Sequence, residues 1–184
     1  MFIKSRRLDL VKHFLIVVDI QNDFVDGSLG SSEAVGIIEN AANKINSHEG
    51  EIIVTFDTHF ENYLETSEGK KLPVPHCIKG THGFELNPTI IEALKGKKYT
   101  SVEKITFGST KLPEIIESLA DGEDFRVTLI GLCTDICVVS NALILKAAFP
   151  EKEISVDPSC MAGVTVQSHN AALETMKMCQ ITVL

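Results

Sequence analysis

Cys137 is the residue of this chain best placed to act as a nucleophile. It lies in the sequence TLIGLCTDICVV (residues 128–139), where an apolar run passes through a glycine and a short polar interruption into a helical pattern. The pattern predicts a strand, a tight turn and the start of a helix. Unpaired backbone N–H groups and the positive end of the helix dipole would then favour a thiolate at Cys137. The alternative is a buried and inert cysteine, which is common in proteins.

Asp19 and Lys104 could complete a hydrolytic site with this cysteine. Each follows a run of residues that reads as a strand. Cys137 would attack a carbonyl carbon, Asp19 would take the thiol proton and pass it to the leaving group, and Lys104 would keep Asp19 ionised. Backbone N–H groups of Cys133 and Cys137 would receive the developing oxyanion. The chemistry would be acyl transfer through a thioester.

A second set of polar residues begins at Asp57. Asp57 and His59 are two residues apart, so their side chains point to the same side if the backbone is extended there. His76 follows in the same loop, with Glu65 and Glu68 between. One carboxylate and two imidazoles suit Zn²⁺, Fe²⁺ or Mn²⁺ and leave positions open for water or a substrate atom. Ordinary polar loop residues are the alternative, because the D-x-H spacing alone is weakly diagnostic.

The elements that would position these residues alternate between strands and helices. Strands are expected at residues 14–18, 52–56, 99–103, 125–130, 153–156 and 181–184. Helices are expected from a Ser31 or Ser32 cap to Gly50, after Asn87 and Pro88, over 113–120, after the turn at Cys137, and over 167–178. Residues 21–30 read as a polar loop, and residues 58–86 as a long irregular segment of a length that usually carries a function.

This order of elements predicts one α/β domain over residues 1–184. We expect a doubly wound, Rossmann-like sheet of six strands, mostly parallel, with helices on both faces. Asp19, Asp57, Lys104 and Cys137 each fall at or just beyond the carboxyl end of a predicted strand. A parallel sheet would bring them to one edge, where such folds bind ligands. Taken singly, each charged residue would also fit a loop cap or a solvated surface.

The composition limits the kinds of molecule that the protein is expected to bind and the cellular compartment in which it is expected to occur. A net charge of -8 for 184 residues offers no cationic surface for nucleic acid or for an anionic membrane. The basic residues Lys4, Arg6 and Arg7 precede an apolar run that stops at Asp19, too short for a signal peptide or a membrane span. Five cysteines without a CxxC pair argue against a disulfide framework. We therefore expect a cytoplasmic protein with reduced thiols.

Five segments of the chain, in this order, match the motifs of a known family. They are VVDIQNDF (17–24), DTH (57–59), PHCIKGTHG (75–83), EKITFGS (103–109) and GLCTDICV (131–138). The chain resembles the isochorismatase-like cysteine hydrolases, and among them the nicotinamidases. The resemblance covers nearly the whole chain and implies a catalytic triad of Asp19, Lys104 and Cys137. It also implies an oxyanion hole after a non-proline cis peptide at Leu132 and Cys133.

The same resemblance implies that Asp57, His59 and His76 bind a divalent cation, which in nicotinamidases contacts the pyridine nitrogen. Zn²⁺ is the first choice, with Fe²⁺ and Mn²⁺ as alternatives. Some nicotinamidases add a glutamate from the intervening loop, and for that role we prefer Glu68 to Glu65.

One departure from the family bears on substrate binding. Nicotinamidases often carry an aromatic residue between the metal-binding Asp and His, where this chain has Thr58. Stacking on a substrate ring would then fall to Phe24 or Phe60. Cys133 is expected to pack under the turn, a redox partnership with Cys137 being the alternative.

Three hypotheses for the function remain open at this point. Within the family that the chain resembles, true isochorismatases hydrolyse a vinyl ether and typically lack the nucleophilic cysteine. The presence of Cys137 therefore favours an amide or a related C–N substrate. The first hypothesis is hydrolysis of nicotinamide to nicotinate and ammonia. The second is hydrolysis of another small amide, carbamoyl or ureido compound, and the third is a non-catalytic ligand-binding protein of the same fold. The resemblance also implies a homo-oligomer.

Overall fold

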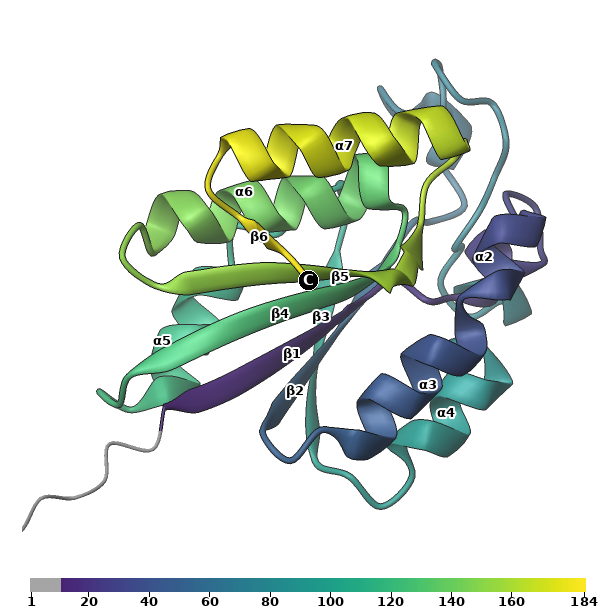
Figure 1. Cartoon of the computed structure of the whole chain (residues 1–184). Helices are drawn as coiled ribbons and strands as arrows, with labels where there is room; N and C mark the ends of the chain where they lie inside the picture. The colour runs from purple at the N-terminus through teal and green to yellow at the C-terminus, as the bar shows by residue number, and fades with distance from the viewer. Residues whose placement is uncertain (1–10) are drawn as a thin grey trace, which may run out of the picture.

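The computed structural model describes residues 11–184, so Lys4, Arg6 and Arg7 lie outside the described residues. Its centre is a sheet of six parallel strands in the order β3-β2-β1-β4-β5-β6 (Figure 1). The strands are β1 Lys12–Val18, β2 Glu51–Asp57, β3 Tyr99–Lys104, β4 Phe125–Leu132, β5 Glu153–Ala162 and β6 Thr182–Val183. The predicted doubly wound α/β fold is confirmed, and every strand pair in the sheet is parallel.

Helices cover both faces of the sheet, α3 and α4 on one face and α5, α6 and α7 on the other (Figure 1). The helices are α1 Asn22–Val25, α2 Ser32–Gly36, α3 Ile38–Ser47, α4 Pro88–Leu94, α5 Leu112–Ala120, α6 Val139–Ala148 and α7 Val166–Met178. Short turns of helix are η1 Tyr63–Glu65, η2 His82–Phe84 and η3 Thr134–Val138, the last a π-helix. Over residues 11–184, none of the helices combines the length and the apolarity that crossing a bilayer requires.

Strand β1 is buried on both faces and divides the apolar core in two. Leu15 and Val17 pack with α3 and α4, whereas Phe14, Ile16 and Val18 pack with α5, α6 and α7. All five side chains are inaccessible to solvent. Since burying one such side chain stabilises the fold by about 1.5–3 kcal/mol, a slip in register would be costly on either face. A strand buried on two sides needs apolar residues throughout, which is why β1 reads as one apolar run.

Helix and strand boundaries differ from the sequence-based expectation in several places. The single helix expected up to Gly50 is two helices, α2 and α3, which meet at Ile37 directly after Gly36, a residue that weakens helices. Ser31 is the cap, because its Oγ accepts the Ala34 N–H at 3.0 Å. Strand β5 continues to Ala162, well past its expected end, because a register shift against β4 restores the pairing beyond an irregular stretch.

The polar loop expected over residues 21–30 also departs from prediction, since it contains the one-turn helix α1. This helix is held in place by the segment that follows β2, because the Asn22 N–H donates to the Glu85 carbonyl at 2.8 Å. Long-range contacts of this kind leave no local signal in the sequence.

The carboxyl edge of the sheet gathers the residues singled out by the sequence. Asp19 follows β1, Asp57 ends β2, Lys104 ends β3, and β4 runs into the turn that carries Cys137. Because these four strands are neighbours, the four residues lie along one edge. The strand order reverses between β1 and β4, which is the point where open α/β sheets bind ligands. Gly131, at φ 117°, permits the approach of these two strands, since a Cβ there would lie 2.1 Å from the Val18 carbonyl oxygen.

A pair of histidines lies far from this edge, at the start of the central strands. His13 Nε2 and Thr128 Oγ1 are hydrogen bonded at 2.8 Å, and the rings of His13 and His48 are 4.8 Å apart. Burial and then the nearby His48 lower the pKa of His13 to about 4. The positive charges of Arg126 and Lys44 add to this effect.

We expect His13 to make the fold sensitive to acid. The unfolded chain takes up a proton on this residue near its usual pKa of about 6.5, but the folded protein does so only near 4. The free energy of unfolding should therefore fall by about 1 to 2 kcal/mol between about pH 7 and pH 4.5, with solvent screening allowed for. His13→Gln keeps a polar partner for Thr128 and cannot be protonated, so urea unfolding of this variant should show a smaller loss. An equal loss in both proteins would contradict the assignment.

Candidate active site

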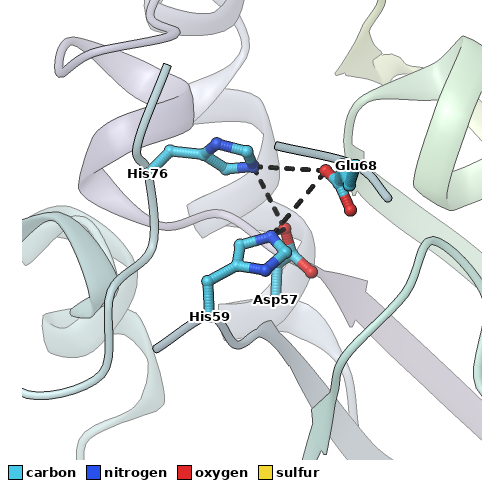
Figure 2. Close-up of side chains that lie close together, drawn as sticks. All are labelled: Asp57, His59, Glu68 and His76. Atoms are coloured by element: carbon cyan, nitrogen blue, oxygen red, sulfur yellow. Dashed lines mark hydrogen bonds and ion pairs between the residues drawn. The ribbon is translucent and has the colours of Figure 1, made fainter. Parts of the chain in front are cut away.

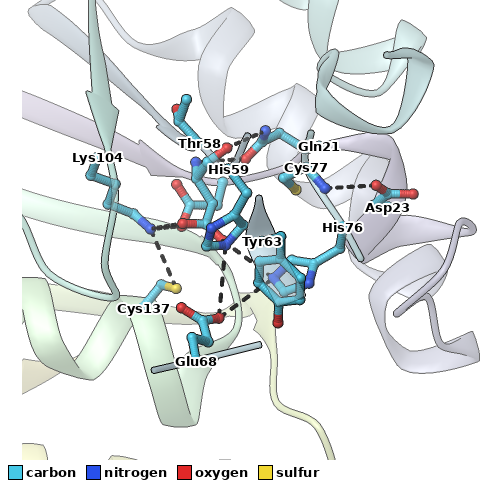
Figure 3. A network of polar contacts seen from close by, with 12 residues as sticks. Gln21, Asp23, Thr58, His59, Tyr63, Glu68, His76, Cys77, Lys104 and Cys137 are labelled. Carbon is cyan, nitrogen blue, oxygen red and sulfur yellow. Dashed lines mark hydrogen bonds and ion pairs between the residues drawn. The ribbon is translucent and has the colours of Figure 1, made fainter. Parts of the chain in front are cut away.

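The ammonium group of Lys104 lies buried among two carboxylates and a thiol. Its Nζ is 2.6 Å from Asp19 Oδ2 and 3.3 Å from Asp57 Oδ1. The same atom is 3.5 Å from Cys137 Sγ (Figure 3). An unpaired ammonium group in the interior would cost several kcal/mol in lost hydration, so the two carboxylates are what allow a lysine here.

The charges in this group depend on one another. Burial by itself would lower the pKa of Lys104, but the negative charges of Asp19 and Asp57 raise that pKa above its usual range. Burial raises the pKa of the Cys137 thiol well above its usual value, and the negative charge of Asp19 raises it further. The resting site therefore holds a neutral thiol beside an ion pair. Burial and the charge of Asp19 thus oppose the thiolate expected from the helix terminus, and Lys104, 3.5 Å from the sulfur, favours it.

Asp19 has one oxygen available to accept a proton. Thr55 Oγ1 donates to Asp19 Oδ1 at 2.7 Å. Asp19 Oδ2 is buried and, apart from its ion pair with Lys104, has no hydrogen-bond partner among residues 11–184. Burial also raises the pKa of the Asp19 carboxyl group, an effect that Lys104 opposes. A carboxylate with these properties is suited to act as a general base.

The turn that carries Cys137 is held by its own backbone and by one buried amide. The peptide bond between Leu132 and Cys133 is cis, as the resemblance implied. The Cys133 carbonyl then accepts the N–H groups of Ile136 and Val138 at 3.1 and 3.0 Å. Asn141 Nδ2 donates to the Cys137 carbonyl at 2.8 Å, which ties the turn to helix α6.

Beside the thiol, four side chains bring one nitrogen or oxygen atom each to within 4.8 Å of one another (Figure 2). They are Asp57, His59, Glu68 and His76. Asp57 Oδ2 lies 3.1 Å from His59 Nε2 and 3.5 Å from His76 Nε2. Glu68 Oε1 lies 3.8 Å from His59 Nε2 and 3.6 Å from His76 Nε2. Glu65 does not join this cluster of described residues, and its side chain is exposed.

The donor atoms of this cluster fit a divalent cation. His76 Nδ1 lies 2.8 Å from the Val74 carbonyl oxygen, which makes it the donor and leaves the Nε2 lone pair directed at the cluster. Burial would raise the pKa of Asp57, but the nearby His59 and His76 and the positive charge of Lys104 hold it far below its usual range, so this carboxylate is charged. Two imidazole nitrogens and two carboxylate oxygens are a donor set that Zn²⁺, Fe²⁺ and Mn²⁺ accept.

Cys137 and the four residues of the cluster line one cavity of about 850 Å³, whereas Asp19 and Lys104 are buried behind its lining. Phe24 also lines it, with its ring 5.5 Å from that of His76, so it is placed to contact a substrate ring. Phe60 is outside the lining and is 52% exposed, so the expectation that it stacks on a substrate is wrong. The reason is local: the backbone at His59 pairs with Ile78 as in a sheet, and the next side chain points to the opposite side.

Cys133 lines the same cavity and is only half-buried, so it does not pack entirely under the turn as expected. Burial raises the pKa of its thiol to about 12. All five cysteines are free thiols.

The family to which the chain belongs follows from a comparison with known proteins. The family model of the isochorismatase domain matches residues 13–184. The chain belongs to the isochorismatase family. As a member of it, the protein is a hydrolase.

Several relatives of this isochorismatase-family protein are named nicotinamidases. It is 28% identical to the nicotinamidase/pyrazinamidase of Mycobacterium tuberculosis, with 91% of this chain and 95% of that protein covered. It is 26% identical to the nicotinamidase of Schizosaccharomyces pombe, with 92% and 91% covered. The solved pyrazinamidase/nicotinamidase of Streptococcus mutans matches with a TM-score of 0.80 at 26% identity, over 94% of this chain and 100% of that chain. A pyrazinamidase of Pyrococcus horikoshii, solved in complex with zinc, has a TM-score of 0.79 at 24% identity, over 94% and 98%.

Gln21 is part of this isochorismatase-family site, although its sequence pattern alone predicts no role for it. Gln21 is fully buried, and its Oε1 accepts the Asp57 N–H at 2.8 Å. Its Nε2 donates to the carbonyls of Asp57 and Phe84 at 2.9 and 2.8 Å (Figure 3). The amide thus clamps the backbone of Asp57 on both sides. The sequence does place the amide of Gln21 two residues after Asp19, at the end of a buried strand. A polar side chain there needs buried hydrogen-bond partners.

We expect Gln21→Ala to weaken metal binding by about 10- to 100-fold, because the clamp orients Asp57 from outside the donor set. The free energy of unfolding should also fall by about 1 to 3 kcal/mol, since buried backbone groups lose their partners. Competition with a chromophoric chelator measures the first effect and urea unfolding the second.

Ser155→Ala is the matched control for this experiment. Ser155 is a buried polar residue that hydrogen bonds with Thr128 at 2.9 Å, remote from the cluster. This variant should lose stability and keep its metal affinity. Equal metal affinity in Gln21→Ala and wild type would reject the role given to the clamp.

Proposed function

We propose that this protein hydrolyses nicotinamide to nicotinate and ammonia through a thioester on Cys137. The observation that carries the proposal is that the Cys137 thiol and a set of metal-ligand side chains line the same cavity, and that Lys104, ion paired with Asp19, lies 3.5 Å from the thiol. Such a cavity can hold a ring nitrogen at one end while the carboxamide meets the nucleophile at the other. The names of the relatives support the same substrate.

The first half of the reaction forms the thioester. Cys137 Sγ bonds to the amide carbon while Asp19 Oδ2 takes the thiol proton, which removes the obstacle of a high thiol pKa. The charge that develops on the carbonyl oxygen is received by backbone N–H groups of Cys133 and Cys137. Asp19 then gives the proton to the amide nitrogen, the C–N bond breaks, and ammonia leaves. Lys104 remains charged throughout and stabilises the negative charge as it passes from Asp19 to the sulfur.

The second half restores the enzyme. Asp19 takes a proton from a water molecule, whose oxygen bonds to the thioester carbon. The C–S bond breaks, Cys137 recovers a proton, and nicotinate is released. One carboxylate therefore serves both halves, and Lys104 lies 2.6 Å from the oxygen that takes the proton.

The residues for binding the substrate lie beside this machinery. Asp57, His59, Glu68 and His76 would hold a Zn²⁺, Fe²⁺ or Mn²⁺ ion, which when bound supplies a Lewis acid for the pyridine nitrogen. Phe24 would pack against the ring.

The first test is ammonia release from nicotinamide by the metal-loaded protein. Cys137→Ala should abolish turnover, and Asp19→Asn should lower kcat by about 100-fold or more, because the general base is lost. Cys179→Ala removes an exposed thiol and should leave turnover unchanged. Failure of the folded, metal-loaded protein to release ammonia from nicotinamide would reject this substrate.

A second test concerns the metal. We expect dialysis against a chelator to suppress turnover and added Zn²⁺, Fe²⁺ or Mn²⁺ to restore it. Glu68→Gln should weaken metal binding by about tenfold or more, as measured by competition with a chromophoric chelator. Glu65→Gln is the matched control, because it alters a glutamate of the same loop that is exposed. A similar loss of affinity in both variants would contradict the role of Glu68.

A further inference from the structure

The cavity above Cys137 has a buried end and an open rim. At the buried end, Cys137 is 4% exposed and Phe24 is 7% exposed. The apolar side chains that line the rim are exposed to a much larger extent: Leu72 by 37%, Phe107 by 42%, Val164 by 59% and Ile105 by 73%. The cavity therefore extends from the nucleophile to an apolar mouth at the surface.

The rim is fixed to the turn that carries the nucleophile. Asn141, which holds the Cys137 carbonyl, also donates to the Phe107 carbonyl at 3.3 Å and accepts the Ser109 N–H at 2.9 Å. On the other side, the Val164 N–H lies 3.1 and 3.2 Å from the two carboxylate oxygens of Asp135, within the same turn. These hydrogen bonds tie the backbone of Phe107 and of Val164 to the turn that carries the thiol, as a preformed subsite requires.

The size of the cavity exceeds what a single-ring amide needs. Its volume of about 850 Å³ lies in the upper part of the range found for pockets that enclose drug-sized ligands. A single-ring amide held between the metal ligands and Cys137 would leave the rim in contact with water. Apolar side chains exposed together in this way are typical of a surface that a ligand covers. Thr66, Ser67 and Lys71 also line the cavity, so the apolar part of the mouth is limited to a few side chains.

We propose that the rim formed by Leu72, Ile105, Phe107 and Val164 is a second subsite, which binds an alkyl or aryl substituent on the substrate. The preferred substrates are then primary amides whose ring carries an apolar group, and unsubstituted nicotinamide fills only the inner part of the cavity. This inference rests on the proposed amide hydrolysis at Cys137 and names the class of substrate for it.

The test compares nicotinamide with analogues that carry methyl, propyl, pentyl or phenyl groups at ring positions 5 or 6. For the series that points toward the rim, kcat/KM for ammonia release should rise about two- to fourfold for each added methylene, as burial of apolar area predicts. Affinity is measured in parallel by calorimetry on zinc-loaded Cys137→Ala protein, so that binding is tested independently of turnover.

Two variants and a control locate the effect. Ile105→Ala and Phe107→Ala should reduce the ratio of kcat/KM for the pentyl analogue over nicotinamide by about threefold or more. Ile91→Ala, which removes a half-exposed apolar side chain from helix α4, should leave that ratio and the turnover of nicotinamide unchanged.

The outcomes separate this inference from the proposed function. Ammonia release from nicotinamide with no gain in kcat/KM or affinity for any longer analogue would overturn the subsite and leave the proposed function standing. A gain in affinity along the series in Cys137→Ala, without turnover by the wild type, would support the subsite and reject the proposed function. If Phe107→Ala and Ile105→Ala instead change the mass measured by sedimentation and leave the length dependence intact, the rim is an interface between copies and the subsite is rejected.

Discussion

The burial of the Lys104 ammonium group is the constraint on which the rest of the site depends. A cation removed from water needs carboxylates around it, and Asp19 and Asp57 supply them at 2.6 and 3.3 Å. Asp57 then has one oxygen facing Lys104 and the other facing two histidines. The hydrolytic group and the metal-ligand group are thus not independent, because they share this carboxylate, and the buried amide of Gln21 holds its backbone in place.

The parallel sheet explains why the cation between Asp19 and Asp57 is a lysine. Neighbouring strands are about 4.8 Å apart, and Lys104 on β3 has to reach Asp19 beyond β1, across the whole of β2. A long, unbranched side chain spans that distance along the carboxyl edge, passing Asp57 on the way. Cys137 approaches from the opposite side, on the turn after β4. Strand order, and not proximity in the chain, therefore decides which residues meet.

The protonation of Cys137 shows which of two opposing effects is larger. A position at the start of a helix favours a thiolate by a modest amount. Burial and the charge of Asp19 act in the other direction, and they outweigh it. In the proposed reaction the thiol would therefore lose its proton to Asp19, whose Oδ2 is ion paired with Lys104. The apolar lining that causes this burial also shapes the cavity in which a substrate would lie.

The sequence by itself determined the fold class and the residues of the carboxyl edge, because apolar runs mark buried strands and right-handed crossovers bring their ends together. Only the tertiary structure decided what depends on the course of the loops and on burial. It brought Glu68 and not Glu65 to the histidines, turned Phe60 outward, and gave Gln21 its partners. These outcomes depend on contacts between segments that lie far apart in the chain. Such contacts leave no local pattern in the sequence.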